Sequence, residues 1–217
     1  MKINVLALAS CFLLVACSGD IARGRAEYDR AVQYLQGVGR EKDETKGIAL
    51  LESASDAGNA DAQIRLGYLY LRGKSIAKDD VKALLLFKRA ALQGNADAQY
   101  NVGLAYVKGI ATVENLKEAF AWFLRAALQG DAGSQYNLGV MYMNGEGVVR
   151  DPLAAYVWFK EATDNGYEGA KQALESARSL LSSDQVKALR DEVEKIEHRI
   201  KKPRPTPQAV EVQTQPL

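Results

Sequence analysis

The side chains that most often carry out enzyme chemistry are sparse in this sequence. It has a single histidine, His198, and two cysteines, Cys11 and Cys17, which both precede residue 18. A catalytic base needs a nucleophile beside it, and a zinc site needs about four Cys, His or carboxylate ligands. His198 has no such companions, and its neighbours are charged, which is typical of a solvated helix face. We therefore expect neither a metal nor a cofactor.

Acidic residues and glycines recur along the chain, but their spacing indicates a structural role. Asp43, Asp79 and Asp151 each precede an apolar helical pattern, where an aspartate caps the first turn of a helix. They do not form pairs that converge on a substrate. The segment Gly145-Glu146-Gly147 lacks the lysine and the preceding strand of a phosphate-binding loop. We therefore expect no enzyme activity.

The one residue with a specific chemical signal is Cys17. Lys2 is followed by an apolar run from Val5 to Ala16, which is too short to span a bilayer. The run ends in Leu14-Val15-Ala16-Cys17, which resembles a bacterial lipobox. This resemblance implies removal of residues 1–16 as a lipoprotein signal peptide and attachment of lipid to Cys17, so that several acyl chains anchor the protein in a membrane.

Two further expectations depend on this signal. Ser18, rather than an aspartate, follows the cysteine, and by resemblance to lipoprotein sorting rules this favours the outer membrane, with the chain facing the periplasm. Residues 17–25 would then be a short lipidated tether. The alternative is an ordinary signal peptide cut near Ala16, with Cys17 incidental.

Charge argues against one class of partner. The formal net charge is +1, and Lys2 is the only charged residue before Cys17, so the chain after cleavage is close to neutral. A nucleic-acid-binding protein needs a basic face that displaces counterions from phosphates. We therefore expect no nucleic-acid partner.

The rest of the chain is organised by a repeat of 36 residues. The same skeleton of small and aromatic residues occurs in successive copies, with Gly67, Gly103 and Gly139, then Tyr70, Tyr106 and Tyr142, then Ala83, Ala119 and Ala155, then Phe87, Phe123 and Phe159, and finally Gly94, Gly130 and Gly166. A worn first copy has Ala31, Tyr34, Gly37, Gly47, Leu51, Ala54 and Gly58 at the same steps. Such regular spacing without insertions identifies a repeat protein.

Within each copy the apolar residues follow a helical period on both sides of a turn-rich segment. Each copy is thus predicted to be a helix–loop–helix pair. Asp151 and Pro152 mark the start of the second helix in the last full copy, since proline fits the first helical position. Glycine is costly inside a helix, so Gly67, Gly103 and Gly139 predict close approach of a neighbouring helix.

The pattern from Leu138 to Ala162, Leu-Gly-x-x-Tyr-x-x-Gly-x-Gly-Val-x-x-Asp-x-x-x-Ala-x-x-Trp-Phe-x-x-Ala, resembles the Sel1-like repeat, a relative of the tetratricopeptide repeat. The resemblance implies an all-α fold, a right-handed α-solenoid over residues 26–181 with repeats at about 26–61, 62–97, 98–133 and 134–169 and then a cap. Ser75 and Ala111 depart from it, because a second loop glycine is expected at these positions.

The carboxyl-terminal part predicts a cap and a tail. Ser182 and Gln185 have the spacing of a capping box, and Val186, Leu189, Val193, Ile196 and Ile200 follow at steps of three and four. We expect a C-terminal capping helix at 182–202 on a monomer, with a dimer through residues 186–200 as the alternative. Residues 203–217 are proline-rich and are expected to be disordered.

The tetratricopeptide resemblance also implies where a partner binds. The first helices line the concave surface of such arrays, at columns that fall here on Tyr28, Ile64, Tyr100 and Tyr136, on Val32, Tyr68, Leu104 and Val140, and on Leu35, Leu71, Val107 and Met143, bordered by Gln36, Arg72, Lys108 and Asn144. The candidate partner-binding residues are Tyr28, Tyr68, Tyr100, Tyr136, Leu104, Met143, Arg72 and Lys108. A groove of this kind suits an amphipathic helix or an extended peptide. The alternative is that curvature buries much of this face and that partners bind elsewhere.

Two functions follow as expectations. The first is a non-catalytic envelope lipoprotein that acts as a protein–protein interaction scaffold or adaptor for assembly of a cell-envelope complex, as implied by known Sel1-like lipoproteins. The second is a protein that binds or processes cell-wall material, such as peptidoglycan or polysaccharide. A scaffold needs apolar anchor sites, whereas a glycan site needs carboxylates facing a cleft, and the sequence favours the scaffold.

Overall fold

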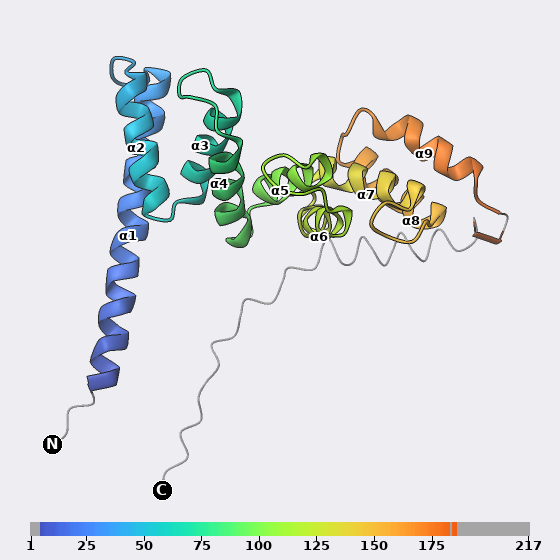
Figure 1. Ribbon diagram of the computed structural model, residues 1–217, viewed down its shortest axis with the longest axis horizontal. Coiled ribbons are helices and arrows are strands. Elements are labelled where there is room, and N and C mark those ends of the chain that lie inside the picture. The colour runs from blue at the N-terminus through green and yellow to red at the C-terminus, as the bar shows by residue number, and fades with distance from the viewer. Residues whose placement is uncertain (1–4, 183, 186–217) are drawn as a thin grey trace, which may run out of the picture.

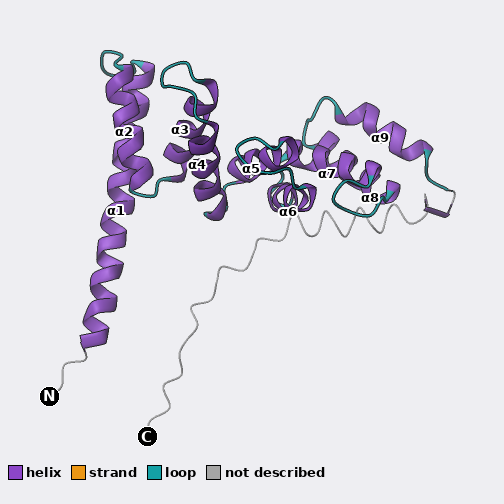
Figure 2. Cartoon of the chain, viewed as in Figure 1, coloured by secondary structure: helices purple, strands orange, loops and turns teal. Residues whose placement is uncertain are grey.

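The computed structural model describes residues 5–182 and 184–185, which form helices joined by short loops (Figure 2). The described helices are α1 (Val5–Gln36), α2 (Glu44–Asp56), α3 (Ala60–Arg72), α4 (Asp80–Leu92), α5 (Ala96–Lys108), α6 (Leu116–Ala127), α7 (Ala132–Asn144), α8 (Pro152–Asp164) and α9 (Ala170–Ser179). No strand occurs among them. The predicted all-α fold is thus confirmed, and beyond Gln185 the expected capping helix and the tail lie outside the described residues.

The helices form antiparallel pairs that stack into a solenoid (Figure 1). The larger contacts between described helices all join elements that are consecutive in the chain. Helices α1 to α4 stand upright in Figure 1, whereas α6 is seen end-on and α7 and α8 run across the view. The direction of the pairs therefore turns along the array, as expected when each repeat contacts only its neighbours.

Both ends of the repeated helices are defined by side chains that the sequence supplies at fixed steps. The second helices begin after Asp43, Asp79, Asn115 and Asp151, and each of these side chains accepts a hydrogen bond from a backbone N–H in the first turn. The first helices α3, α5 and α7 begin in the same way after Asn59, Asn95 and Asp131. These helices end at Gly73, Gly109 and Gly145, which adopt left-handed backbone angles.

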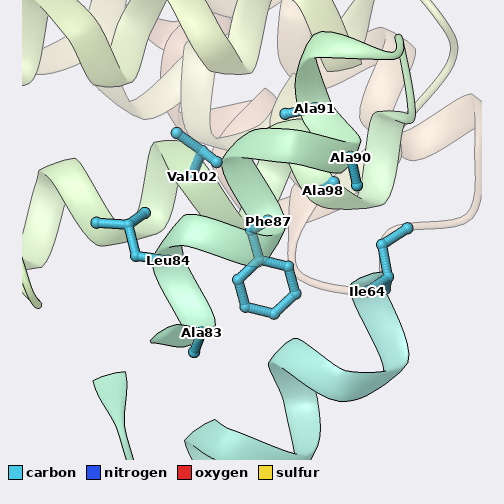
Figure 3. Packing of buried hydrophobic residues seen from close by; sticks show 8 residues of the cluster. All are labelled: Ile64, Ala83, Leu84, Phe87, Ala90, Ala91, Ala98 and Val102. Atoms are coloured by element: carbon cyan, nitrogen blue, oxygen red, sulfur yellow. The ribbon is translucent and has the colours of Figure 1, made fainter. Parts of the chain in front are cut away.

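The glycines inside the first helices lie under an aromatic ring of their own repeat. A Cβ atom at Gly103 would lie 2.6 Å from Phe123, and one at Gly139 would lie 2.5 Å from Phe159. Figure 3 shows the equivalent Phe87 pointing from α4 towards the helix that carries Ile64. The predicted close approach at these glycines is confirmed. The phenylalanines pack the two helices of a repeat against each other, and Phe87 also belongs to the core cluster shared with the next repeat.

The tether expected at residues 17–25 is instead part of α1, and this corrects the sequence analysis. No proline interrupts the stretch, and Gly24 is buried where a Cβ atom would lie 3.0 Å from the Ala57 Cβ. The absence of a side chain at Gly24 lets α1 pack against the end of α2, so the helix continues towards the amino terminus. No helix in the described part of the chain is long and apolar enough to cross a membrane.

The loops between paired helices touch the preceding repeat. The Ser75 hydroxyl donates a hydrogen bond to the Glu44 carboxylate at the start of α2. Gly147 approaches the Leu116 carbonyl at the start of α6, where a Cβ atom would lie 2.4 Å from its oxygen. In the third repeat, Ala111 takes the left-handed angle that glycine favours, with φ of 56°.

The chain after the fourth repeat also follows expectation as far as it is described. Helix α9 begins at Ala170, within the cap that was expected after the fourth repeat. The Ser182 backbone N–H donates to Gln185 Oε1, and the Gln185 N–H donates to Ser182 Oγ. The predicted capping box is therefore present.

Candidate protein-binding site

Tyr68 connects two first helices through its hydroxyl. The hydroxyl donates to Asp97 Oδ1 at 2.7 Å and accepts from Asn101 Nδ2 at 2.7 Å, both on α5. Burial, together with the hydrogen bond to the Asp97 carboxylate, raises the pKa of Tyr68 to about 12. The side chain is only partly buried. Tyr68 therefore holds neighbouring repeats together while part of it remains accessible.

Tyr100 and Tyr136 are the equivalent residues of two successive repeats. Tyr100 contacts the next first helix, α7, and Tyr136 contacts the segment that precedes α9. Tyr100 lies beside Gly133, where a Cβ atom would be 3.0 Å from its ring. Tyr136 stacks on Tyr167, with the ring centroids 4.7 Å apart. Burial raises the pKa of Tyr100, and the nearby Tyr167 and Asp131 add to the shift. The two candidate anchors are thus half-buried parts of the repeat junctions.

Tyr28 lies at a separate hollow near the start of the solenoid. This hollow has a volume of about 420 Å³ and lies between α1, the turn that joins α2 to α3, and the end of α4. Arg25, Asp29 and Asp61 line it together with Tyr28. Its walls therefore mix charged and apolar residues, the latter including Ile21 and Ala57, unlike the apolar groove that the sequence predicts.

Two of the predicted partner-binding residues come together at an apolar hollow between α3, α4 and α5. It has a volume of about 120 Å³ and is lined by Leu71, Asp80, Leu84, Phe87, Asn101, Leu104, Ala105, Lys108 and Ile110. Leu104 forms part of the wall, and the exposed Lys108 stands at the end of α5. Arg72 is exposed at the end of α3 but does not line this hollow. Met143 lies farther along, packed against the core beside Phe159.

The sequence explains why this junction is hollow. Leu84 occupies the position that Phe120 and Tyr156 hold in the next two repeats. Phe120 extends to Tyr142, with the ring centroids 5.4 Å apart in an edge-to-face arrangement. At the junction between the second and third repeats, the shorter Leu84 side chain lines the hollow. This difference can be read from the sequence, because Leu84 is aliphatic where the equivalent residues of the next two repeats, Phe120 and Tyr156, are aromatic.

A second feature that sequence reasoning missed is a ladder of buried glutamines. Gln63, Gln99 and Gln135 each donate from Nε2 to a carbonyl near the end of the preceding second helix, at Ser55, Ala91 and Ala127. Their Oε1 atoms accept from Gln93, Gln129 and Asn165, which follow the second helix of the same pair. The ladder ties the three junctions between the four matched repeats in the same way, and its 36-residue spacing was readable from the sequence.

Acid–base or metal chemistry has no evident centre in the part of the chain that the structure describes. No group of three or more His, Cys, Asp or Glu residues there lies close enough together to hold a metal ion. The carboxylates whose positions recur serve as helix caps, as at Asp79 and Asp151. The geometry instead offers hollows and half-buried side chains along the first helices, which suits binding.

Comparisons with known proteins agree with this architecture. A family model described as Sel1 repeat matches residues 24–59, 60–95, 96–131 and 132–167. A comparison with curated proteins found no match.

Among solved structures, the chain is similar to a Sel1 repeat protein from Oxalobacter formigenes, with 30% identity and a TM-score of 0.68 over 79% of this chain and 73% of that one. It is also similar in fold to c5321, a protective antigen of uropathogenic Escherichia coli, with 23% identity and a TM-score of 0.57. That match covers 82% of this chain and 46% of c5321. On the strength of four matched repeats that span most of the described helices, this chain belongs to the Sel1 repeat family.

Proposed function

We propose that this protein is a non-catalytic scaffold that binds other proteins in the cell envelope, anchored to the outer membrane by lipid on Cys17 and facing the periplasm. The observation that carries the proposal is the array of four Sel1 repeats over residues 24–167, because such repeats generally mediate protein–protein interactions. The apolar hollow at Leu71 and Leu104 supports it, since protein interfaces are centred on buried apolar anchors.

The proposed anchor fits the shape of the chain. The amino-terminal part of α1 extends beyond the stacked pairs, away from the loop that joins α1 to α2 (Figure 1). Lipid on Cys17 would leave the hollow between α3, α4 and α5 free to meet a partner in the periplasm. This arrangement depends on modification of Cys17, which a direct experiment can test.

The anchor is tested with the substitution Cys17→Ala. Incorporation of labelled palmitate and recovery with outer-membrane fractions are both expected to be lost, because the alanine has no thiol to acylate. The substitution Cys11→Ala is the matched control, since it removes the other cysteine of the same apolar run. Unchanged labelling and membrane recovery of the Cys17 variant would contradict the lipid anchor.

The scaffold role is tested by photo-crosslinking in intact cells. A photoreactive amino acid in place of Lys108 is expected to form adducts with a discrete protein, whereas the same replacement at the exposed Lys171 on α9 serves as the control. Probes at Tyr28 and Arg72 cover other parts of the first-helix face. A chain that forms no protein adduct at any of these positions would contradict the proposed function.

A specific observation also favours a second candidate, the binding of cell-wall material. The larger hollow at Tyr28 presents the Asp29 and Asp61 carboxylates and the Arg25 guanidinium, which are groups that can bind sugar hydroxyls and amides. If this hollow binds peptidoglycan, the chain sediments with purified cell-wall sacculi, and the double substitution Asp29→Asn with Asp61→Asn reduces the bound fraction. Failure of the unmodified chain to sediment with sacculi would remove this candidate.

A further inference from the structure

We propose that the hollow between α3, α4 and α5 is a pocket for one apolar side chain of a partner protein, of leucine, methionine or phenylalanine size, next to an acidic residue in the partner's sequence. The proposal rests on the proposed protein-binding function and adds the chemistry of the ligand. The ligand is a segment of a partner protein. The proposal is argued from the volume of the pocket, from the residues that form its walls and from the charge at its mouth.

The volume matches a single large apolar side chain. The pocket measures about 120 Å³, and a buried cavity of about 150 Å³ is large enough for benzene. Its walls are mostly apolar and include Leu71, Leu84, Phe87 and Leu104, so a polar side chain entering it would lose more hydration than the polar wall residues, such as Asp80 and Asn101, could replace. The pocket therefore selects an apolar side chain.

The charge at the mouth selects the neighbouring residue. Asp80 lines the pocket, but its carboxylate is paired with Lys78 Nζ at 3.1 Å. Lys108 also lines it, is exposed, and forms no ion pair with another described residue. The uncompensated charge beside the apolar walls is thus positive. A carboxylate within one or two residues of the inserted side chain would pair with the Lys108 ammonium group.

Two substitutions between repeats make this pocket particular to one junction. Leu84, which lines the pocket, stands where the next repeat has the larger Phe120, whose ring contacts Tyr142. Ile110 supplies an apolar rim where the neighbouring repeats have Lys74 and Glu146. The second-to-third repeat junction therefore combines an unfilled core position with an apolar loop residue.

The proposal can be tested with a random dodecapeptide library displayed on phage and selected on the full-length chain in detergent micelles. Enriched peptides are expected to share an apolar residue with aspartate or glutamate beside it. The dissociation constant of the synthesised peptide is then measured by fluorescence polarisation. Leu84→Phe, which introduces the residue of the next repeat, is expected to weaken binding roughly tenfold or more by filling the pocket.

Charge is tested separately with an exposed residue, so that folding is preserved. Lys108→Ala is expected to weaken the peptide about two- to fivefold, and Lys108→Glu to weaken it further, with both effects shrinking at high salt. The matched control Lys171→Ala removes an exposed lysine on α9 and should leave the dissociation constant unchanged. Thermal unfolding followed by circular dichroism confirms that each variant is folded.

Three outcomes would overturn the proposal. Selection could yield no peptide that binds the unmodified chain, or peptides without the acidic and apolar pair, or peptides that bind Leu84→Phe and Lys108→Glu as tightly as the unmodified chain. The wider scaffold role is judged independently in cells. With the probe at Arg72, which keeps Lys108 intact, an adduct that the Leu84→Phe chain still forms would mean that the pocket proposal fails while the scaffold role stands, whereas loss of the adduct with a folded variant supports both.

Discussion

Gly103 shows how one missing side chain sets the distance between two helices. A Cβ atom there would lie 2.6 Å from the ring of Phe123, which is itself fully buried and has no space to move into. We expect Gly103→Leu to lower the free energy of unfolding by roughly 1–3 kcal/mol or more through overpacking. The change is measured as a fall in melting temperature by circular dichroism.

The matched control for this substitution is Gly169→Leu. Gly169 precedes α9, is exposed, and has an ordinary negative φ of −71°, and a Cβ atom there would lie 3.3 Å from the Tyr167 ring, a milder approach than the 2.6 Å at Gly103. We expect it to change stability by less than about 1 kcal/mol. Equal melting temperatures for the two variants would show that Phe123 does not constrain Gly103.

Ala111 illustrates the opposite case, because it carries a side chain at a position whose backbone conformation favours glycine. Its φ of 56° places an alanine in the left-handed region, which costs a residue with a Cβ atom roughly 1–2 kcal/mol. Ala111→Gly removes this strain but makes the unfolded chain more flexible, so we expect a net gain of about 0.5–1 kcal/mol in urea unfolding. Ala77→Gly is the control, because Ala77 is a loop residue without a positive φ, and this substitution should not raise the free energy of unfolding.

Tyr68 links pH to stability through the bond between α3 and α5. Its pKa is raised from 10 to about 12, so its stabilising contribution is fully present below about pH 10 and is lost as the pH rises through about 12. Tyr68→Phe removes the hydroxyl that donates to Asp97, and we expect a loss of roughly 1 kcal/mol at neutral pH, a modest figure because the hydroxyl is partly solvated.

The measurement is the urea midpoint at about pH 8 and at about pH 11.5. The difference between the unmodified chain and the phenylalanine variant should shrink at the higher pH. Tyr136→Phe is the control, because the Tyr136 ring stacks on Tyr167 and that contact does not depend on its hydroxyl. A Tyr68 variant with the same midpoints as the unmodified chain at both pH values would show that this hydroxyl does not stabilise the junction.

Helices of different repeats are joined by more than apolar packing. Gln99 is 2% exposed, donates to the Ala91 carbonyl at 3.1 Å and accepts from Gln129 at 2.7 Å. Gln99→Leu keeps the volume but removes one of the two donors to the Ala91 carbonyl, which still accepts from the Gly94 N–H at 3.0 Å, so the loss of this hydrogen bond costs about 1 kcal/mol. We expect a lower melting temperature and a broader transition, since coupling between repeats is weakened.

Gln129→Leu provides the comparison for this junction. The Gln129 side chain is exposed, so water can replace it as the partner of Gln99. We expect an effect within about 0.5 kcal/mol. A result in which the Gln129 variant is the more damaging of the two would show that the buried bond to Ala91 is not what holds the helices.

The helices and their pairing were predictable from the sequence because each rests on local signals repeated at one spacing. Asp79 and Asp151 mark helix starts, and Gly67, Gly103 and Gly139 mark contacts under a ring. The course of α1 through residues 17–25 was not predicted. It depends on Gly24 meeting Ala57, a contact between residues distant in the chain that no local pattern announces.

The candidate site was only partly predictable for a similar reason. Assigning the first helices to a concave face brought Leu71, Leu104 and Lys108 into consideration, and these three residues do share a pocket. The tyrosine anchors were predicted only from their equivalent positions in the repeats. In the structure, Tyr68, Tyr100 and Tyr136 form contacts at repeat junctions. A pocket is unfilled volume, and it becomes visible only when side chains from three helices are placed together.

The equal length of the repeats makes the entire array modular. Because the matched repeats follow one another without insertion, residues 96–131 can be removed so that Asn95 is followed directly by Ala132. Asn95 already accepts from a backbone N–H at the start of α5, as Asp131 does at the start of α7. Gln135 would meet the Ala91 carbonyl in place of that of Ala127.

We expect this shortened chain to fold, with unchanged helix content per residue by circular dichroism and a lower melting temperature, because it has one junction fewer. Removing only residues 96–125 should instead prevent cooperative folding, since it leaves the end of α6 where a first helix must begin. In the longer deletion Val140 and Asn144 take the places of Leu104 and Lys108, so the proposed pocket loses its cation. The shortened chain should therefore fold yet bind the selected acidic peptides at least about two- to fivefold more weakly, as Lys108→Ala does, and a chain that folds and still binds them with full affinity would place their site outside this junction.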